Sequence, residues 1–319
     1  MPPTPTPSGN LVAVEEGSKK AIVAAFIANL GIAIAKFIGF FLTGSAGLLA
    51  EAGHSLADTG NQGLLLLGSK KSRREPTAEH PFGFGRERYF WSFVVALVLF
   101  SMGGLFALYE GIEKLVHPHK ADRLGVAIII LLISIALESY SLMTGVREAK
   151  HVKPASMSWW RFIRTARHPE LPIVLLEDTG AEIGLLMALF GIIMASVTDN
   201  PRWDAVGSIG IGLLLVTIAI ILAVEMKSLL IGESAEPVVE AAIRKAITEH
   251  ELVTSLIHIR TEHLGPEEVL VAAKVEFDPG MTVPQLADAI DSVESAIRAT
   301  TPTAHLIYLE PDIRRSVTS

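Results

Sequence analysis

The segment from Gly47 to Gly68 reads GLLAEAGHSLADTGNQGLLLLG and is about the length of one bilayer crossing. It carries four polar side chains in an otherwise apolar setting: Glu51, His54, Asp58 and Gln62. In a helix, steps of three and four residues place these groups on one stripe. Charged groups at membrane depth normally face a bundle interior or a wet cavity. The stripe therefore predicts an ion or substrate path, and a polar helix–helix contact is the alternative.

A second polar cluster, LLEDTGAEIGLL, runs from Leu175 to Leu186 in a later apolar window. Asp178 and Glu182 are four residues apart and lie on one helical face, whereas Glu177 is about 100° away from that face. Two helices thus offer matching pairs of donor groups. If these helices pack together, they form a metal site of one imidazole and three carboxylates from His54, Asp58, Asp178 and Glu182.

Composition places the chain among membrane proteins and limits its chemistry. Half of the 319 residues are hydrophobic and the mean hydropathy is +0.44, more than one soluble core needs. The absence of cysteine excludes disulfides and thiolate ligands, so imidazole and oxygen must hold any metal. A membrane metalloenzyme is a further alternative, but the sequence has no HExxH signature, and we expect no enzymatic activity.

Six apolar windows are long enough to cross a bilayer: Ala21 to Leu42, Gly47 to Gly68, Tyr89 to Tyr109, Leu124 to Thr144, Leu171 to Ala195 and Trp203 to Met226. Short turn sequences at Thr43 to Gly47 and Thr198 to Pro201 predict antiparallel neighbours. With the amino terminus in the cytoplasm, most basic loop residues are cytoplasmic, and four lie outside: Lys114, Lys120, Arg123 and Arg202. Both termini are therefore expected in the cytoplasm of a multi-pass protein.

The chain outside these windows divides into two tails and a soluble domain. Residues 1–18 are rich in Pro, Thr, Ser and Gly, and we interpret them as a disordered tail without a signal peptide. The membrane domain is expected over 19–232, a cytoplasmic domain over 233–312 and a short tail over 313–319. From Glu236 onward the periodicity predicts an α+β domain of αββαβ order, and fourteen acidic against seven basic residues give it a net charge of −7.

From Lys19 to Asp312 the sequence resembles the cation diffusion facilitator family, particularly its zinc transporter 9-like branch. The resemblance is carried by four motifs: GSAGLLAEAGHSLADTGNQ at Gly44 to Gln62, HPFGFGRERYFW at His80 to Trp91, LLEDTG at Leu175 to Gly180 and SLLIGESAEP at Ser228 to Pro237. It implies an all-α bundle of six transmembrane helices, a metallochaperone-like cytoplasmic domain and a homodimer. It also implies export of a divalent cation coupled to inward proton movement.

In this family the transport site combines an HxxxD or DxxxD pair on the second helix with a comparable pair on the fifth. The first pair matches His54 and Asp58. On the fifth helix the position four before Asp178 is Val174, which cannot bind metal, so either Glu182 completes the site or Asp178 works with water.

The donor set suits Zn²⁺ as the transported substrate, and the carboxylates would also accept Mn²⁺, Fe²⁺ or Co²⁺. Because metal and protons compete for the same groups, we expect a proton-coupled antiporter that works by alternating access. We expect it in the plasma membrane, and we expect no nucleic-acid partner. The alternatives are an exporter of the other metals, a metal channel, a receptor and a non-transporting metal-binding partner. Candidate regulatory donors in the cytoplasmic domain are His258, Glu262, His263, His305 and Glu310.

Overall fold

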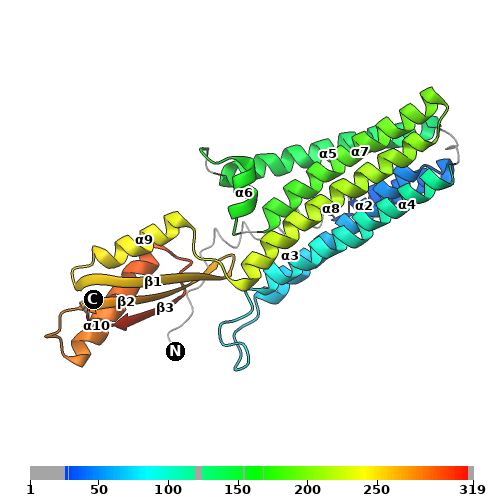
Figure 1. The fold of residues 1–319 in the computed structure, drawn as a ribbon. Coiled ribbons are helices and arrows are strands. Elements are labelled where there is room, and N and C mark those ends of the chain that lie inside the picture. Colours follow the sequence, from blue (N-terminus) through cyan, green and yellow to red (C-terminus); the bar gives the residue numbers. More distant parts are fainter. Residues whose placement is uncertain (1–25, 28, 119–123, 154, 168, 315–319) are drawn as a thin grey trace, which may run out of the picture. The chain divides into compact units, whose positions relative to one another are not determined.

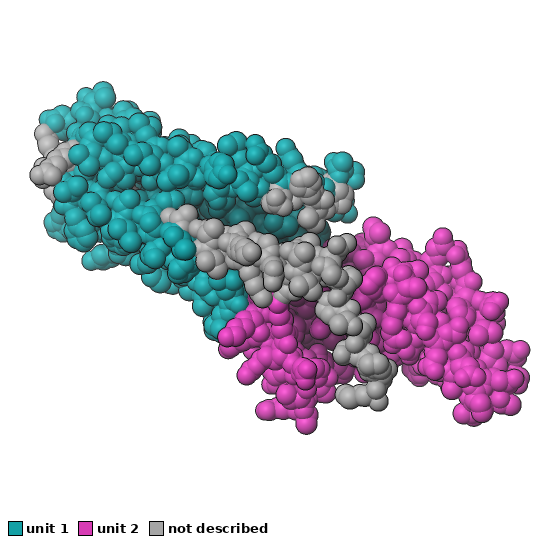
Figure 2. Space-filling view, turned by 180° about the vertical axis from the view of Figure 1, so that it is seen from behind, with its two compact units in different colours: residues 1–68, 91–225 teal, residues 69–90, 226–319 magenta. Residues whose placement is uncertain are grey.

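The computed structural model describes residues 26–314, with gaps at 28, 119–123, 154 and 168. The predicted tail over 1–18 and the last five residues of the predicted tail over 313–319 lie outside this part of the chain. The chain divides into two compact units, coloured separately in Figure 2. One comprises residues 1–68 and 91–225, and the other residues 69–90 and 226–319.

Long helices make up the first unit (Figure 1). Four of the described helices are long and apolar enough to cross a membrane: Glu87–Val116, Leu124–Arg147, Glu170–Thr198 and Arg202–Ile231. The described parts of the first two predicted spans are also helical, but they do not meet the same requirement of length and apolar composition. The described helix Asn29–Thr43 is shorter, and α2 (Ala46–Ser72) carries the polar stripe. The prediction of a helical membrane region is thereby confirmed.

The elements of this unit follow the predicted windows closely. The third span consists of α3, the π-helical segment η1 and α4, and a short helix, α6, precedes the fifth span. Their bounds are α3 Glu87–Val98, η1 Leu99–Leu105, α4 Phe106–Val116, α5 Leu124–Val152, α6 Trp159–Thr165, α7 Glu170–Thr198 and α8 Arg202–Ile231. Residues with positive φ make two of the turns: Gly44 (φ 65°) before α2 and Asp199 (φ 53°) after α7.

The helices divide their apolar side chains between neighbours and the lipid. On α5, a row of large apolar side chains is exposed: Ile129, Leu132, Ile133 and Leu137. Another face of α5 packs along α7, and Phe162 of α6 closes one end of that contact in a cluster with Ala149 and Leu175. An apolar surface of this kind suits a hydrocarbon solvent.

Glycines bring the helices of this unit close together. A Cβ on Gly212 of α8 would lie 2.9 Å from the Gly104 carbonyl oxygen, and a Cβ on Gly191 of α7 would lie 2.9 Å from the Trp203 carbonyl oxygen. Lipid tails provide no hydrophobic force between helices, so small residues that permit close backbone packing stabilise such bundles. Larger side chains at these positions would push α7 or α4 away from α8.

The second unit contains a three-stranded sheet and two helices. In chain order the elements are α9 Pro237–Thr248, β1 Val253–Gly265, β2 Glu268–Phe277, α10 Val283–Thr300 and β3 Leu306–Pro311, which confirms the predicted αββαβ order. The sheet order is β1-β2-β3, with β1 antiparallel and β3 parallel to β2. The parallel pair requires a crossover, which α10 provides, and a capping box between Thr282 and Gln285 begins that helix.

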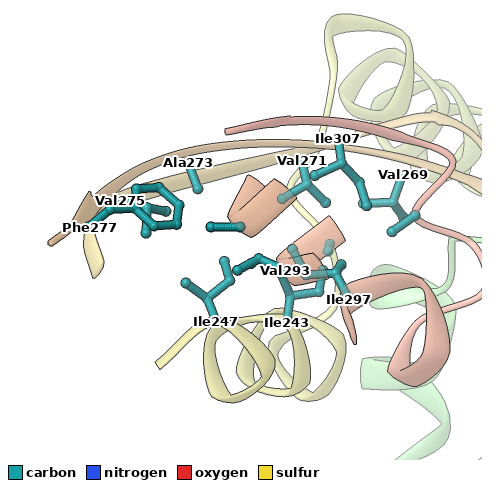
Figure 3. Close-up of a cluster of buried hydrophobic side chains, with 13 residues drawn as sticks. Ile243, Ile247, Val269, Val271, Ala273, Val275, Phe277, Val293, Ile297 and Ile307 are labelled. Carbon is teal, nitrogen blue, oxygen red and sulfur yellow. The ribbon is translucent and has the colours of Figure 1, made fainter. Parts of the chain in front are cut away.

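The core of this unit lies between the sheet and both helices (Figure 3). Along β2 the burial alternates strictly, so that Val269, Val271, Ala273, Val275 and Phe277 are the buried set. In Figure 3 these side chains meet those of Ile243 and Ile247 from α9 and of Val293 and Ile297 from α10. The two helices therefore cover the same face of the sheet.

Replacing Ile243 tests this core. Because its side chain is 0% exposed, we expect Ile243→Ala to destabilise the sheet unit by about 2–5 kcal/mol. Val238 on the same helix is 80% exposed, and we expect Val238→Ala to change stability by less than about 0.5 kcal/mol. Hydrogen exchange of the β2 amides in the full chain measures both. Equal protection in the two variants would contradict this assignment of the core.

Candidate functional site

His54 and Asp58 lie one helical turn apart on α2 and approach each other. Nδ1 of His54 is 3.4 Å from Oδ1 of Asp58, and the two residues are 0% and 5% exposed. Nε2 of His54 is buried without a hydrogen-bond partner among the described residues. Buried polar atoms in proteins are nearly always paired, so an unpaired imidazole nitrogen indicates a place for a ligand.

The π-helical segment η1 packs against this part of α2. A Cβ on Gly103 of η1 would lie 4.0 Å from Nδ1 of His54, and a Cβ on Gly53 would lie 3.1 Å from the Phe106 ring. Glycine on both surfaces therefore lets η1 and α4 approach the turn that carries His54. Single π-helical turns occur frequently at functional sites, and this one borders the imidazole.

Glu177 of α7 is the residue of the fifth span that reaches the stripe on α2. Its carboxyl group lies against that of Asp58, and Nδ2 of Asn61 donates to its Oε1 at 2.7 Å. Glu177 is buried. Two buried carboxylates in contact repel unless they share a proton or a cation. The pair formed by Asp58 and Glu177 is therefore suited to hold positive charge.

Asp178 and Glu182 contact α5 instead. Oγ of Ser141 donates to Oδ2 of Asp178 at 3.0 Å, and Oγ of Ser139 donates to Oε1 of Glu182 at 2.9 Å. Within the part of the chain that the structure describes, Oε2 of Glu182 is buried without a hydrogen-bond partner. No group of three or more His, Asp or Glu residues stands ready to hold a metal ion within the described chain. The structure thus joins His54 with Asp58 but does not gather all four predicted donors.

Sequence reasoning left Glu177 and Asn61 out of the site. Helical spacing put Glu177 off the face shared by Asp178 and Glu182, and that spacing is correct within α7. The rotation of α7 relative to α2 decides which face meets Asp58, and periodicity within one helix contains no information on it. The one available signal was the adjacency of two carboxylates in LLEDTG.

A buried lysine lies beside the same stripe. Nζ of Lys36 donates to Oγ of Ser55 at 2.7 Å and to Oε2 of Glu51 at 3.2 Å, and it is 4.0 Å from Oε1 of Glu138 on α5. Lys36 is 0% exposed. Its charge is therefore paired inside the bundle.

A second buried lysine closes the contact between α4, α8 and the turn before α2. Nζ of Lys114 donates to the Gly44 carbonyl oxygen at 2.7 Å and is 2.9 Å from Oδ2 of Asp204. Oγ of Ser45 donates to Oδ1 of Asp204 at 3.1 Å. Lys114 and Asp204 are 0% and 2% exposed. This cluster matches one lysine with one carboxylate, and it contains none of the predicted metal donors.

The candidate donors of the sheet unit each have separate surroundings. Glu262 pairs with Arg86, and Nδ1 of His263 is 3.2 Å from the Gly265 carbonyl oxygen. Glu310 pairs with Lys274 at 3.0 Å, and its hydrogen bond raises the pKa of that lysine. His258 lies opposite Lys274 in the strand register. The described residues of this unit contain no cluster that could hold a metal ion.

His305, the last of these candidates, lies close enough to Glu268 to interact with it electrostatically. Partial burial raises the pKa of Glu268, and the His305 imidazole opposes that rise. One imidazole beside one carboxylate is too small a donor set for a closed metal site.

The segment from His80 to Trp91 also contacts the sheet. Arg86 pairs with Glu262 of β1, and Arg88 lies 3.5 Å from Glu267. A Cβ on Gly85 would lie 2.6 Å from the Leu264 carbonyl oxygen, so only glycine fits at this approach. Contact with β1 and with the turn that follows it therefore accounts for the glycine and for both arginines.

Comparison with known proteins gives two family matches. Residues 22–231 match the cation efflux transmembrane domain, and residues 235–312 match the cytoplasmic domain of cation efflux proteins. Together the two matches include every residue considered above for the site.

Individual relatives agree with these matches. The proton-coupled zinc antiporter SLC30A9, mitochondrial, of Homo sapiens is 33% identical over 264 residues, which is 82% of this chain and 46% of that protein. Metal tolerance protein C4 of Arabidopsis thaliana is 29% identical over 84% of this chain and 59% of that protein. Zinc transporter ZitB of Pectobacterium atrosepticum is 34% identical over 38% of this chain and 37% of that protein. The chain spans about half the length of the human relative.

Variants of Lys114 and Asp204 test the buried ion pair. Because Lys114→Met leaves Asp204 buried without its cation, we expect it to destabilise the helical unit by about 3–5 kcal/mol. Removing both charges in Lys114→Met/Asp204→Asn leaves no buried ion, so the double variant should be more stable than the single one. Thermal unfolding in detergent compares the two. A double variant less stable than Lys114→Met would show that the pair is not the source of the effect.

Proposed function

We propose that this chain, which belongs to the cation efflux family, exports Zn²⁺ from the cytoplasm in exchange for protons. The observation that carries the proposal is the buried pair of His54 and Asp58, in which Nε2 of His54 has no hydrogen-bond partner among the described residues. Two relatives support zinc, since one is named a proton-coupled zinc antiporter and another a zinc transporter. Their names favour Zn²⁺ over Mn²⁺, Fe²⁺ or Co²⁺. On this proposal the protein is a secondary transporter and not an enzyme.

We propose that His54, Asp58, Asp178 and Glu182 bind the ion during transport. His54 supplies a nitrogen donor and the three carboxylates supply oxygen donors, which suits tetrahedral Zn²⁺. A small movement of α7 relative to α5 would free Asp178 and Glu182 from their serine partners. Glu177 lies next to Asp58 and is a further oxygen donor, positioned by Asn61.

Proton coupling follows from the chemistry of these donors. Imidazole and carboxylate groups bind metal only when deprotonated, so Zn²⁺ and protons exclude each other. The carboxyl groups of Asp58 and Glu177 lie close enough together to share a proton when no metal is bound. Zn²⁺ entering from the cytoplasm displaces such protons, and protons entering from the other side displace Zn²⁺. A change of access between the two sides completes the cycle.

For the architecture, we propose six transmembrane helices over 19–232 and a cytoplasmic domain over 233–312, with both termini in the cytoplasm. The short helix Asn29–Thr43 and the polar α2 supply the two spans beyond the four apolar ones. We further propose a homodimer that associates through the cytoplasmic domain. Its sheet has a face opposite α9 and α10, on which Tyr308 is 54% exposed.

For the membrane, we propose the plasma membrane. The human relative is named as mitochondrial, so a mitochondrial membrane is the competing location. Fractionation of cells that express the tagged chain distinguishes the two.

Variants of the α2 pair test the proposed function. His54→Ala and Asp58→Ala should each abolish Zn²⁺ transport, because each removes a donor from a buried site, while leaving the protein dimeric. Uptake of Zn²⁺ into proteoliposomes measures transport, with size-exclusion chromatography as the check on assembly. His258→Ala, in the sheet unit, is the matched control and should retain most of the activity. Loss of folding in both α2 variants would instead indicate a structural cluster.

The fifth span is tested in the same assay with and without a pH gradient. We expect Asp178→Ala and Glu182→Ala to abolish gradient-dependent flux. We expect Glu177→Gln to reduce it by about tenfold, since mutation of a residue that supports a metal ligand typically lowers affinity or activity by about 10- to 100-fold. Persistent flux in Glu182→Ala would leave a three-residue site. Absence of Zn²⁺ flux in the unmodified protein, with flux of Mn²⁺ or Fe²⁺, would overturn the assignment of the substrate.

A further inference from the structure

Lys36 is held by three groups from two neighbouring helices. Its Nζ donates to Ser55 and Glu51 on α2, at 2.7 Å and 3.2 Å, and lies 4.0 Å from Glu138 on α5. The Lys36 and Glu51 side chains are 0% exposed and that of Glu138 is 7% exposed. This fixes one ammonium group inside the bundle.

The ammonium group contacts Glu51 of the α2 stripe but leaves His54 and Asp58 to the ion. Its contacts, Glu51, Ser55 and Glu138, are separate from the residues proposed to bind the ion. Ser55 directly follows His54 in the chain, and Lys36 acts electrostatically on both His54 and Asp58. A cation bound by His54 and Asp58 would therefore share its surroundings with a fixed positive charge.

A fixed ammonium group beside a cation site weakens cation binding. Like charges repel more strongly in a protein interior than in water, and the repulsion doubles for a divalent ion. A transport site must bind its ion tightly enough to load and weakly enough to release it. Several buried carboxylates around one Zn²⁺ favour tight binding, so a nearby positive charge would serve release.

A purely structural role explains these contacts less well. Replacing a buried ion pair by apolar residues of similar volume is often neutral or stabilising, so the pair is weak evidence for stability alone. The bundle contains a comparison within the same chain. Lys114 is equally buried, with one carboxylate partner, and it contacts none of the proposed donors.

We propose that Lys36 is a positioning residue that lowers the affinity of the His54 and Asp58 site for Zn²⁺ and thereby promotes release of the ion. This inference rests on the proposed function, because it concerns the same transport site. The positive charge of Lys36 acts on the bound ion through space, while Ser55 and Glu51 hold the ammonium group in place.

Equilibrium binding of Zn²⁺ tests the sign of the effect. Using purified full-length protein in detergent and a competing fluorescent chelator, we expect Lys36→Gln to lower the Kd by about tenfold. Lys36→Arg keeps the charge and should keep the Kd near that of the unmodified protein. Glu138→Gln leaves the ammonium group less compensated and should raise the Kd. A general packing defect would weaken binding in both neutralised variants, so an unchanged or raised Kd in Lys36→Gln overturns the proposal.

Lys114→Gln is the matched control, and we expect it to lower thermal stability without lowering the Kd. If Lys36→Gln does not fold, Glu51→Gln and Glu51→Gln/Lys36→Met replace it. The single variant should bind Zn²⁺ more weakly, and the added loss of the lysine should restore binding. Failure of that restoration overturns the proposal.

Zn²⁺ flux in proteoliposomes separates this inference from the proposed function. With the tighter Kd, Lys36→Gln should show a lower KM and a lower maximal rate. Flux by the unmodified protein together with an unchanged Kd in Lys36→Gln refutes the role of Lys36 alone. If the unmodified protein shows no flux but Lys36→Gln still has a lower Kd for Zn²⁺ than the unmodified protein, only the proposed function is refuted.

Discussion

Compensation of buried charge is the constraint on which the helical unit depends. A carboxylate or ammonium group at membrane depth requires a partner, since neither lipid nor a dry interior replaces its hydration. The protein supplies partners from separate helices: Glu51 for Lys36, Asp204 for Lys114 and Asn61 for Glu177. Nε2 of His54 stands apart from this pattern because it is buried without a partner among the described residues.

Close backbone packing makes these pairings possible. Glycines at the contacts of α7 and α4 with α8 hold the helices near enough for short polar side chains to meet. The π-helical segment η1 adds a local change of helical phase next to His54. Packing and polar pairing therefore support each other, and a bulky substitution at Gly104 or Gly212 would act on both.

Local features were predictable from the sequence, whereas features set by helix rotation were not. The periodicity after Glu236 predicted the αββαβ order that the structure shows, and the burial of β2 alternates from residue to residue as such a strand requires. The i, i+4 spacing of His54 and Asp58 predicted that their side chains would lie close together, because both belong to one helix and its geometry determines their separation. The partners of Glu177 and Lys36 belong to other helices, and their identity depends on how those helices rotate and pack. Periodicity within one helix cannot supply that information.

The two buried lysines differ in the number of carboxylates that surround them. Lys114 meets one carboxylate and a carbonyl oxygen, which completes its surroundings and joins three segments of the chain. Lys36 meets two carboxylates beside the stripe that carries His54. The first cluster is balanced, so it has no electrostatic demand for another ion. The second retains negative charge next to donors that have no partner among the described residues, so further positive charge can be compensated there without unfolding the helices that hold these groups.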